Sequence, residues 1–182
     1  MAKALVLYAT TEGQTAKVAH HIADVARGHG HEVAVHTAEE ALDGKAPPLD
    51  GFDVVFVGGS LHEGRHQRSL RRFLREHGQE LAAKPTGLFS LSLAAASADP
   101  EERKAADHCI DELLKETGFT PTVRASVAGA LRYTQYSWLK RFVMKRIAAS
   151  EGGETDTSKD FEYTDWDAVT AFADEVLAKA PS

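Results

Sequence analysis

Apolar residues gather in short runs along this chain, and the runs alternate with longer amphipathic stretches. Residues 4–7 and 53–59 are largely apolar, as in parallel strands that are buried on both faces of a sheet. Residues 32–37 alternate polar and apolar side chains, which favours a strand nearer an edge. Two further runs, at 86–93 and 122–131, complete a set of five predicted strands.

The stretches between these runs space their apolar residues as helices do. Asp99, Pro100 and Glu102 supply an N-cap, a first-turn proline and a third-position carboxylate for one of them. Thr164 together with Asp167 is predicted to cap the last. The predicted helices cover residues 14–27, 70–81, 100–117 and 166–178.

Strict alternation of strands and helices predicts an α/β protein. We expect a single domain over residues 1–182, with a doubly wound five-stranded parallel sheet of order 2-1-3-4-5 and helices on both faces. The length and a hydrophobic content of 43% are sufficient for one full core. In such a sheet the ligand site lies beyond the carboxyl ends of the strands, where the strand order reverses.

The loop after the first predicted strand has the composition of a phosphate-binding site. Thr10, Thr11 and Thr15 supply hydroxyl groups, Gly13 lets the backbone approach a ligand, and the helix that starts near Gln14 directs free amides at the loop. No lysine or arginine lies between residues 4 and 16, and the extra glycines of dinucleotide loops are absent. We therefore interpret the loop as a cradle for the phosphate of flavin mononucleotide (FMN). The alternative is an ordinary strand-to-helix turn with a threonine cap.

Two more loops should meet this one at the same edge of the sheet. Residues 58–64 follow the third predicted strand, and residues 90–100 follow the fourth. With the expected strand order, the three loops surround one planar ligand.

These features together resemble the flavodoxin-like family. The resemblance implies that the first loop holds the FMN phosphate and that the other two wrap the isoalloxazine ring. Flavodoxin carriers commonly sandwich the ring between aromatic side chains, whereas the second loop here offers only Leu61 and His62, which leaves a ring face open to a substrate. The implied FMN contacts are Thr10, Thr11, Glu12, Gly13, Gln14, Thr15, Ser60, Leu61, His62, Glu63, Gly64, Ser90, Leu91, Ser92, Leu93 and Ala94.

Composition argues against several other classes of protein. A formal net charge of -6 disfavours a nucleic-acid binder. The single cysteine, Cys109, permits no intrachain disulfide, and we expect it to be chemically silent in a reducing compartment. The histidines occur in pairs without a completing set of ligands, so we expect no metal. No signal peptide or membrane-spanning run is evident, which predicts a cytoplasmic protein with room for a peripheral membrane contact.

A segment after the fifth predicted strand concentrates positive charge and aromatic residues. From Arg124 to Ser150 there are six basic residues and no aspartate or glutamate. From Trp138 onward the apolar residues cover about half of a helix circumference, and the mixture is typical of a helix that contacts a membrane surface or a partner. The alternative is an ordinary helix packed on the sheet.

Motifs in the C-terminal part resemble a narrower family. AGALRY at 128–133, Tyr136 and Trp138, GGETDT at 152–157 and YTDW at 163–166 are similar to the flavodoxin-type, quinone-dependent protoporphyrinogen oxidases of bacterial haem synthesis. The similarity covers essentially the full chain, with a basic aromatic insert at about 132–157. One departure is His62 and Glu63, where family members often have arginine and tyrosine.

This second resemblance implies FMN-dependent oxidation of protoporphyrinogen IX to protoporphyrin IX, with a membrane quinone of the menaquinone type as acceptor. Chemistry would run on the flavin, with no catalytic side chain. Gly152 and Gly153 would lie at the flavin edge or form a tight turn. The candidates for substrate or membrane contact are Arg132, Tyr133, Trp138, Lys140, Arg141, Lys145 and Arg146.

Two other functions fit parts of the sequence. A soluble flavodoxin that carries single electrons would normally present an acidic surface near the flavin, and the basic segment counts against it. A flavoprotein quinone reductase with another electron donor is also compatible, as is a homo-oligomer.

Overall fold

The computed structural model describes residues 1–131 and 161–181. Its main sheet has the order β2-β1-β3-β5-β6, and each neighbouring pair in this path is parallel. The predicted doubly wound sheet and its order are therefore confirmed. A short sixth strand, β4, pairs antiparallel with the end of β3. The bounds are β1 Lys3–Ala9, β2 Glu32–Thr37, β3 Val54–His62, β4 Arg65–His66, β5 Thr86–Ser92 and β6 Val123–Ala128.

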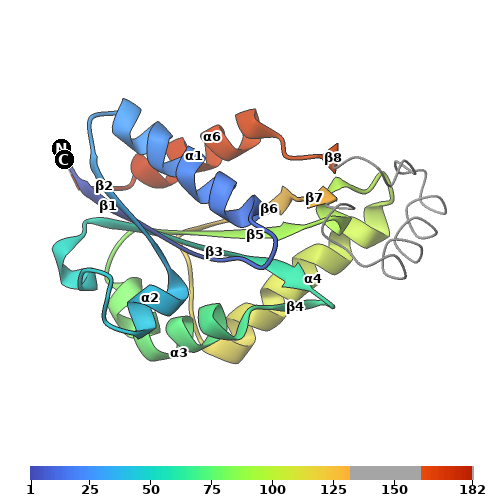
Figure 1. Cartoon of the computed structure of the whole chain (residues 1–182), viewed down its shortest axis with the longest axis horizontal. Helices are drawn as coiled ribbons and strands as arrows, with labels where there is room; N and C mark the ends of the chain where they lie inside the picture. The colour runs from blue at the N-terminus through green and yellow to red at the C-terminus, as the bar shows by residue number, and fades with distance from the viewer. Residues whose placement is uncertain (132–160, 182) are drawn as a thin grey trace.

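Helices cover both faces of the sheet (Figure 1). On one face α1 (Gln14–Gly28) packs beside α6 (Trp166–Leu177), and on the other lie α2 (Ala38–Leu42), α3 (Arg68–Ala82) and α4 (Pro100–Thr117). The N and C termini lie together at the end of the molecule opposite β4. Among the described residues, no helix is long and apolar enough to cross a bilayer.

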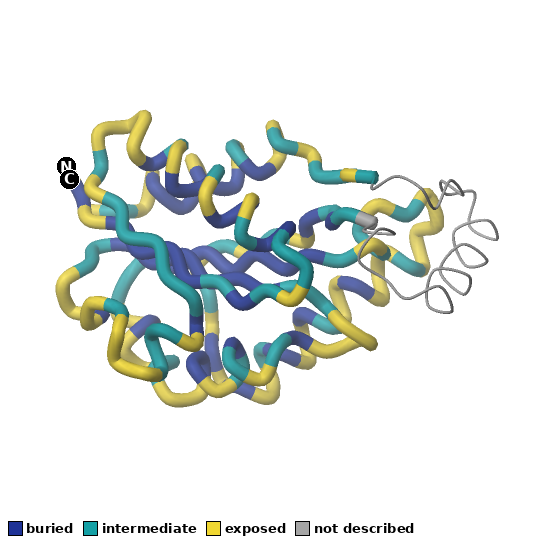
Figure 2. Tube along the Cα trace, in the orientation of Figure 1, coloured by how far each residue is buried: buried dark blue, intermediate teal, exposed yellow. Residues whose placement is uncertain are grey.

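The strands bury side chains on both faces, as their apolar runs predict. In β1, Ala4 and Val6 belong to the core beneath α1 and α6, whereas Leu5 and Leu7 belong to the core beneath α3 and α4. Figure 2 shows the resulting band of buried residues along the sheet. This two-sided core fixes the carboxyl ends of the strands, and hence the loops that follow them.

The fifth predicted strand is wrong as a single element. β6 ends at Ala128, and after Gly129 a separate two-residue strand, β7 (Ala130–Leu131), pairs antiparallel with β8 (Phe161–Glu162). The amide of Gly129 donates to the carbonyl of Ser92 at 3.0 Å as the chain leaves the sheet. Small and apolar residues continue through this change of direction, so the hydrophobic pattern does not mark it.

The predicted cap of the last helix is also wrong. Asp165 caps α6, because its carboxylate accepts from the amide of Ala168 at 3.0 Å. The hydroxyl of Thr164 instead donates to the carbonyl of Ala128 at 2.8 Å. Neighbouring threonine and aspartate residues all have capping chemistry, and tertiary contacts select among them.

The second predicted loop is partly strand. β3 continues to His62, and Glu63 and Gly64, with φ of 52° and 76°, turn the chain into β4. Two positive φ values in a two-residue hairpin loop are typical of a type I′ turn. The predicted insert at about 132–157 lies outside the described residues.

Candidate functional site

A cleft opens at the carboxyl edge of the sheet, at the switch point between β1 and β3. It has about 540 Å³ of free space, counting its open mouth. Its lining comes from four segments at the carboxyl ends of β1, β3, β5 and β6. The lining residues are Thr10, Thr11, Glu12, Gln14, Thr15, Ser60, Leu61, His62, Leu91, Ser92, Leu93, Gly129 and Ala130.

The loop at 10–13 is shaped by backbone geometry rather than by a side-chain cap on α1. Gly13 occupies the N-cap position with a left-handed φ of 87°, and no side chain caps the helix there. The hydroxyl of Thr10 accepts from the amide of Gly13 at 2.9 Å, which holds the turn closed. The alternative of a simple threonine cap for α1 is therefore wrong.

Groups suited to an anion converge on this turn. The first intrahelical bond runs from the amide of Lys17 to the carbonyl of Gly13, so the amides of Thr15 and Ala16 precede the hydrogen-bonded part of α1. The side chain of Thr15 is buried, with 1% of the residue exposed, and its hydroxyl has no partner among the described residues. A buried hydroxyl without a partner costs free energy unless a ligand supplies one. Hydroxyls and amides without a nearby cation fit a phosphate monoester, as FMN carries.

Gln67 connects the phosphate loop to the ring end of the cleft. Its side-chain amide donates to the hydroxyl of Ser60 at 2.6 Å and to that of Thr11 at 3.3 Å. Gly59 makes room for it, because a Cβ there would lie 2.8 Å from the Gln67 carbonyl oxygen. Sequence reasoning missed this contact, because a glutamine before a helix has no motif that indicates where its side chain turns.

The ring end of the cleft is largely apolar and open. Leu61, Leu91 and Leu93 line it, and Leu93 is 37% exposed. His62 is the only residue with a ring among the described lining residues. Phe89, the aromatic residue just before the loop that follows β5, is buried in the core against Phe172. No described aromatic side chain therefore covers this part of the cleft as in a flavodoxin sandwich.

Ser90 does not line the cleft. Its hydroxyl lies 2.8 Å from Nε2 of His66, and both residues are buried. Burial, together with the charge of Arg71, lowers the pKa of His66 to about 4. His66 is therefore neutral near pH 7 and ties the β3–β4 hairpin to β5. The alternation of a strand explains the placement, since Ser90 faces away from the cleft while Leu91 faces it.

The segment after residue 160 is anchored to the first turn of α1. Gln14 donates to the hydroxyl of Thr164 at 3.0 Å, and Nζ of Lys17 lies 2.9 Å from the carboxylate of Glu162. Burial opposes ionisation of Glu162, but hydrogen bonds from Lys17, Gln14 and Trp166 outweigh it, so its pKa is lowered. The charge of Lys17, the first cation after the phosphate loop, is thus directed at a carboxylate.

The structure brings most of the predicted FMN contacts together. Of the predicted phosphate-loop residues, all but Gly13 line the cleft. Four predicted ring contacts, Glu63, Gly64, Ser90 and Ala94, do not. Gly129 and Ala130 line it although the sequence placed them inside a strand; applying the same strand-end rule to β6 would have found them.

The predicted contacts in the insert cannot be placed in the cleft. Those that lie outside the described residues are Gly152, Gly153, Arg132, Tyr133, Trp138, Lys140, Arg141, Lys145 and Arg146.

The cysteine lies away from the cleft, and the described residues form no candidate metal site. Cys109 is half-buried on α4, where burial and then Glu112 raise the pKa of its thiol. No group of three or more histidine, cysteine, aspartate or glutamate residues within 1–131 and 161–181 could hold a metal ion.

Comparison with known proteins gives consistent matches. A family model described as a flavodoxin domain matches residues 5–158. Protoporphyrinogen IX dehydrogenase (quinone) from Escherichia coli (strain K12) is 34% identical over 178 residues, which cover 96% of this chain and 94% of that protein. The protein of the same name from Leishmania major is 30% identical over 177 residues, covering 97% of this chain and 75% of its own.

A solved structure supports the fold. Fusobacterium nucleatum flavodoxin bound to flavin mononucleotide matches with a TM-score of 0.56 at 10% identity and covers all of both chains.

Proposed function

The chain belongs to the flavodoxin family, and on that premise we propose that it is an FMN-dependent dehydrogenase that oxidises protoporphyrinogen IX to protoporphyrin IX with a quinone as acceptor. The observation that carries the proposal is the similarity to protoporphyrinogen IX dehydrogenase (quinone) over 96% of the chain, which includes the cleft and the C-terminal segment. The buried hydroxyl of Thr15, which has no partner within residues 1–131 and 161–181, supports the cofactor assignment.

The residues of the cleft would bind FMN at its two ends. Thr10 shapes the turn, and Thr15 with the first amides of α1 would hold the phosphate. By donating to both Ser60 and Thr11, Gln67 would hold the ring end of the cleft at a fixed position relative to the phosphate loop. When bound, FMN supplies the electron acceptance that the oxidation requires.

The open ring end is suited to a large substrate. Among the described residues, Leu61, Leu93 and His62 lie at the mouth of the cleft and no phenylalanine, tyrosine or tryptophan lines it, which suits the approach of an amphipathic macrocycle. No described side chain in the lining is needed as a nucleophile or metal ligand.

The proposal also covers the insert at 132–157, the quinone acceptor and the location of the protein. We place residues 132–157 as an insert of a single 1–182 domain, with Arg132, Lys140 and Arg141 contacting propionates or lipid headgroups. Tyr133, Trp138, Lys145 and Arg146 would add to that surface, and Gly152 and Gly153 would lie at the flavin edge. The acceptor would be a menaquinone, and the protein would lie in the cytoplasm, peripherally on the inner face of the cell membrane.

An anaerobic assay tests the function directly. Purified protein loaded with FMN is mixed with protoporphyrinogen IX and a water-soluble menaquinone analogue, and porphyrin fluorescence is followed. We expect porphyrin to form only when FMN and quinone are both present. Flavin that is reduced by another donor and passes single electrons to a protein partner, without porphyrin formation, would instead identify a flavodoxin carrier.

A further inference from the structure

A second concentration of positive charge lies in β4 and α3, well before the basic segment at 124–150. Residues 65–75 contain five arginines and no aspartate or glutamate. Four of the five, at positions 68, 71, 72 and 75, have the spacing of one helix face. We call Arg65, Arg68, Arg71, Arg72 and Arg75 the arginine stripe.

The stripe has fewer counter-charges than arginines. Glu116 is shared by three guanidinium groups, at 3.0 Å from Arg71, 3.8 Å from Arg65 and 4.0 Å from Arg75. Glu76 pairs with Arg72 at 2.7 Å.

Other charges around the stripe balance one another. Lys115 pairs with Glu112 at 3.8 Å, and Lys45 pairs with Asp43 at 3.1 Å. Arg68 is exposed and has no ion pair among the described residues. Two carboxylates, Glu116 and Glu76, therefore form all the ion pairs of the stripe among the described residues, and the charge of Asp43 also acts on Arg72. Arginines still outnumber these carboxylates, in a protein whose formal net charge is -6.

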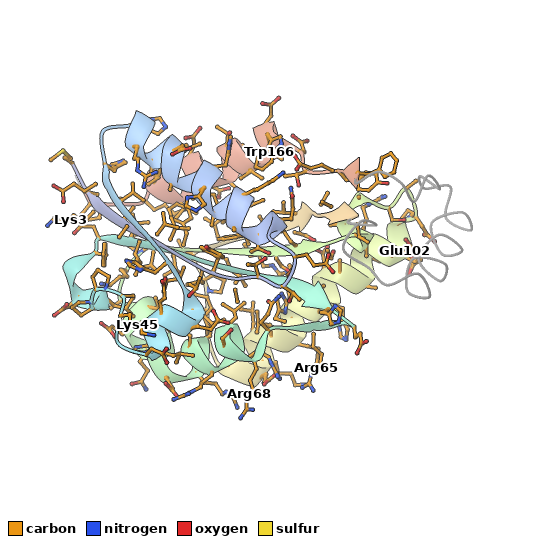
Figure 3. The ribbon with its side chains drawn as sticks, in the orientation of Figure 1. Lys3, Lys45, Arg65, Arg68, Glu102 and Trp166 are labelled. Atoms are coloured by element: carbon orange, nitrogen blue, oxygen red, sulfur yellow. The ribbon has the colours of Figure 1, made fainter. Side chains whose placement is uncertain are left out.

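The stripe begins beside the candidate FMN site. The β3–β4 hairpin contributes Leu61 and His62 to the cleft, and its other strand carries Arg65, which pairs with His62 in the ladder. From Arg68 to Arg75 the stripe extends roughly 10 Å along α3. Figure 3 shows the side chains of Arg65 and Arg68 at the outer edge of the molecule.

The exposed groups of the stripe are cationic rather than apolar. Met1 and Leu93 are the exposed large hydrophobic residues of the described chain, and neither belongs to the stripe. Protein interfaces are anchored by buried tryptophan, tyrosine and arginine side chains that pack together. Within the described residues, this face offers arginines with no exposed large apolar residue beside them. Each exposed arginine is attracted to an anionic lipid headgroup independently of its neighbours, and the planar guanidinium group binds phosphate through two donors at once.

We propose that the arginine stripe docks on an anionic phospholipid surface. The proposal rests on the function proposed above, because it gives a quinone-dependent enzyme a bilayer contact next to the mouth of its cleft. The acidic remainder of the protein would be repelled by the same surface, so the stripe would also orient the molecule.

Vesicle binding of the full chain loaded with FMN tests the proposal. The stripe variant is Arg65→Gln/Arg68→Gln/Arg72→Gln, which spares the less exposed Arg71. Each arginine near an anionic surface contributes about 1 kcal/mol, or about fivefold in partitioning, so the variant should bind phosphatidylglycerol-containing vesicles on the order of 100-fold more weakly. A matched control, Arg27→Gln/Lys104→Gln/Lys179→Gln, removes the same number of positive charges away from the stripe. Its affinity for the vesicles should stay within about twofold of the wild-type affinity.

Changes of lipid and salt, and a variant of the insert, distinguish docking through the stripe from other ways of binding the vesicles. Wild-type binding should disappear on pure phosphatidylcholine and near 1 M salt, where the Debye length is roughly 3 Å. A stripe variant that binds like wild type would overturn the proposal, as would wild-type protein that ignores anionic vesicles at low salt. A variant of Lys140, Arg141, Lys145 and Arg146 that alone abolishes binding would assign the contact to the insert instead.

Activity separates failure of this docking from failure of the proposed function. The stripe variant should form porphyrin at the wild-type rate with a water-soluble quinone and more slowly with a quinone embedded in anionic vesicles. If wild type forms no porphyrin with either quinone, the proposed function fails while the vesicle result still stands. Equal rates for both proteins on vesicle quinone would count against the stripe.

Discussion

The hydroxyl of Thr15 gives the candidate site its sharpest feature at the scale of single residues. It is buried beside the N-terminus of α1 and lacks a partner among the described residues. The sequence predicted that Thr15 belongs to the phosphate loop, but not that it is buried while Thr11 of the same loop is exposed. It could not predict the different role of Thr10, whose hydroxyl holds the turn through the amide of Gly13.

We expect the double variant Thr10→Ala/Thr15→Ala to bind FMN at least tenfold more weakly than wild type. Hydrogen bonds to a charged phosphate are worth about 1.5–3 kcal/mol each, and the variant also loosens the turn. Fluorescence titration with FMN measures the affinity. Riboflavin, which has no phosphate, should bind both proteins almost equally, and an unchanged FMN affinity would contradict the phosphate assignment.

His66 makes the stability of the protein depend on pH. Its folded-state pKa is lowered from 6.5 to about 4, chiefly by burial, so below pH 6.5 the unfolded chain binds more protons than the folded one. The full contribution is present above pH 6.5 and is lost as the pH falls toward 4. The pKa difference corresponds to a loss of about 3 kcal/mol in the free energy of unfolding.

Urea unfolding across this pH window checks the prediction. His66→Gln should flatten the decline of the unfolding free energy between pH 6.5 and 4. His108→Gln, at an exposed position on α4, is the control and should keep the wild-type slope. A variant of His66 with an unaltered slope would show that carboxylates, rather than this imidazole, dominate the acid response.

Cys109 should contribute nothing to turnover. The pKa of its thiol is raised by burial, so little reactive thiolate is present near pH 7. Cys109→Ser should keep porphyrinogen oxidation within about threefold, with a small packing cost. A large loss of rate with FMN content and fold unchanged would reveal a thiol step.

At the scale of elements, patterns along the chain predicted the repeating units but not how they are tied together. Buried strands and amphipathic helices have a period that a sequence displays, so the sheet order and both helical layers could be predicted. The hairpin after β3 could not, because the apolar strand continues into residues that resemble a loop. Contacts such as Gln67 with Ser60 and His66 with Ser90 join residues whose proximity exists only in the folded chain.

Gln67→Ala should lower FMN affinity about fivefold, because the amide bridge between two segments of the candidate FMN site is worth about 1 kcal/mol net. It should also change the flavin absorbance spectrum, since Ser60 at the ring end loses its donor. Gln79→Ala, at an exposed position on α3, which Gln67 immediately precedes, controls for the loss of a glutamine side chain. Equal FMN affinities and flavin spectra for the two variants would contradict a role of Gln67 in ordering the candidate FMN site.

At the scale of the whole molecule, charge is distributed unevenly. The chain is acidic overall, yet the arginine stripe and the segment from 124 to 150 are both strongly basic. The sequence displays both concentrations, but only the fold reveals that the first begins on the hairpin that also lines the cleft. Residues 132–150 of the second basic segment lie outside the described part of the chain. The role proposed for that segment therefore rests on its sequence and on relatives that are similar over 96% of the chain.

Changing Lys140, Arg141, Lys145 and Arg146 to glutamine tests the basic segment. FMN affinity and the flavin spectrum should stay at wild-type values, because the phosphate loop lies elsewhere in the sequence. Each lost cation removes about 1 kcal/mol of attraction to an anionic surface, so co-sedimentation with anionic vesicles should fall and oxidation of porphyrinogen by lipid-embedded quinone should slow. The difference should shrink as salt screens the surface. Wild-type protein that ignores vesicles at low salt, together with a variant that turns over at the wild-type rate, would make this segment a packed structural helix and favour a soluble flavodoxin carrier.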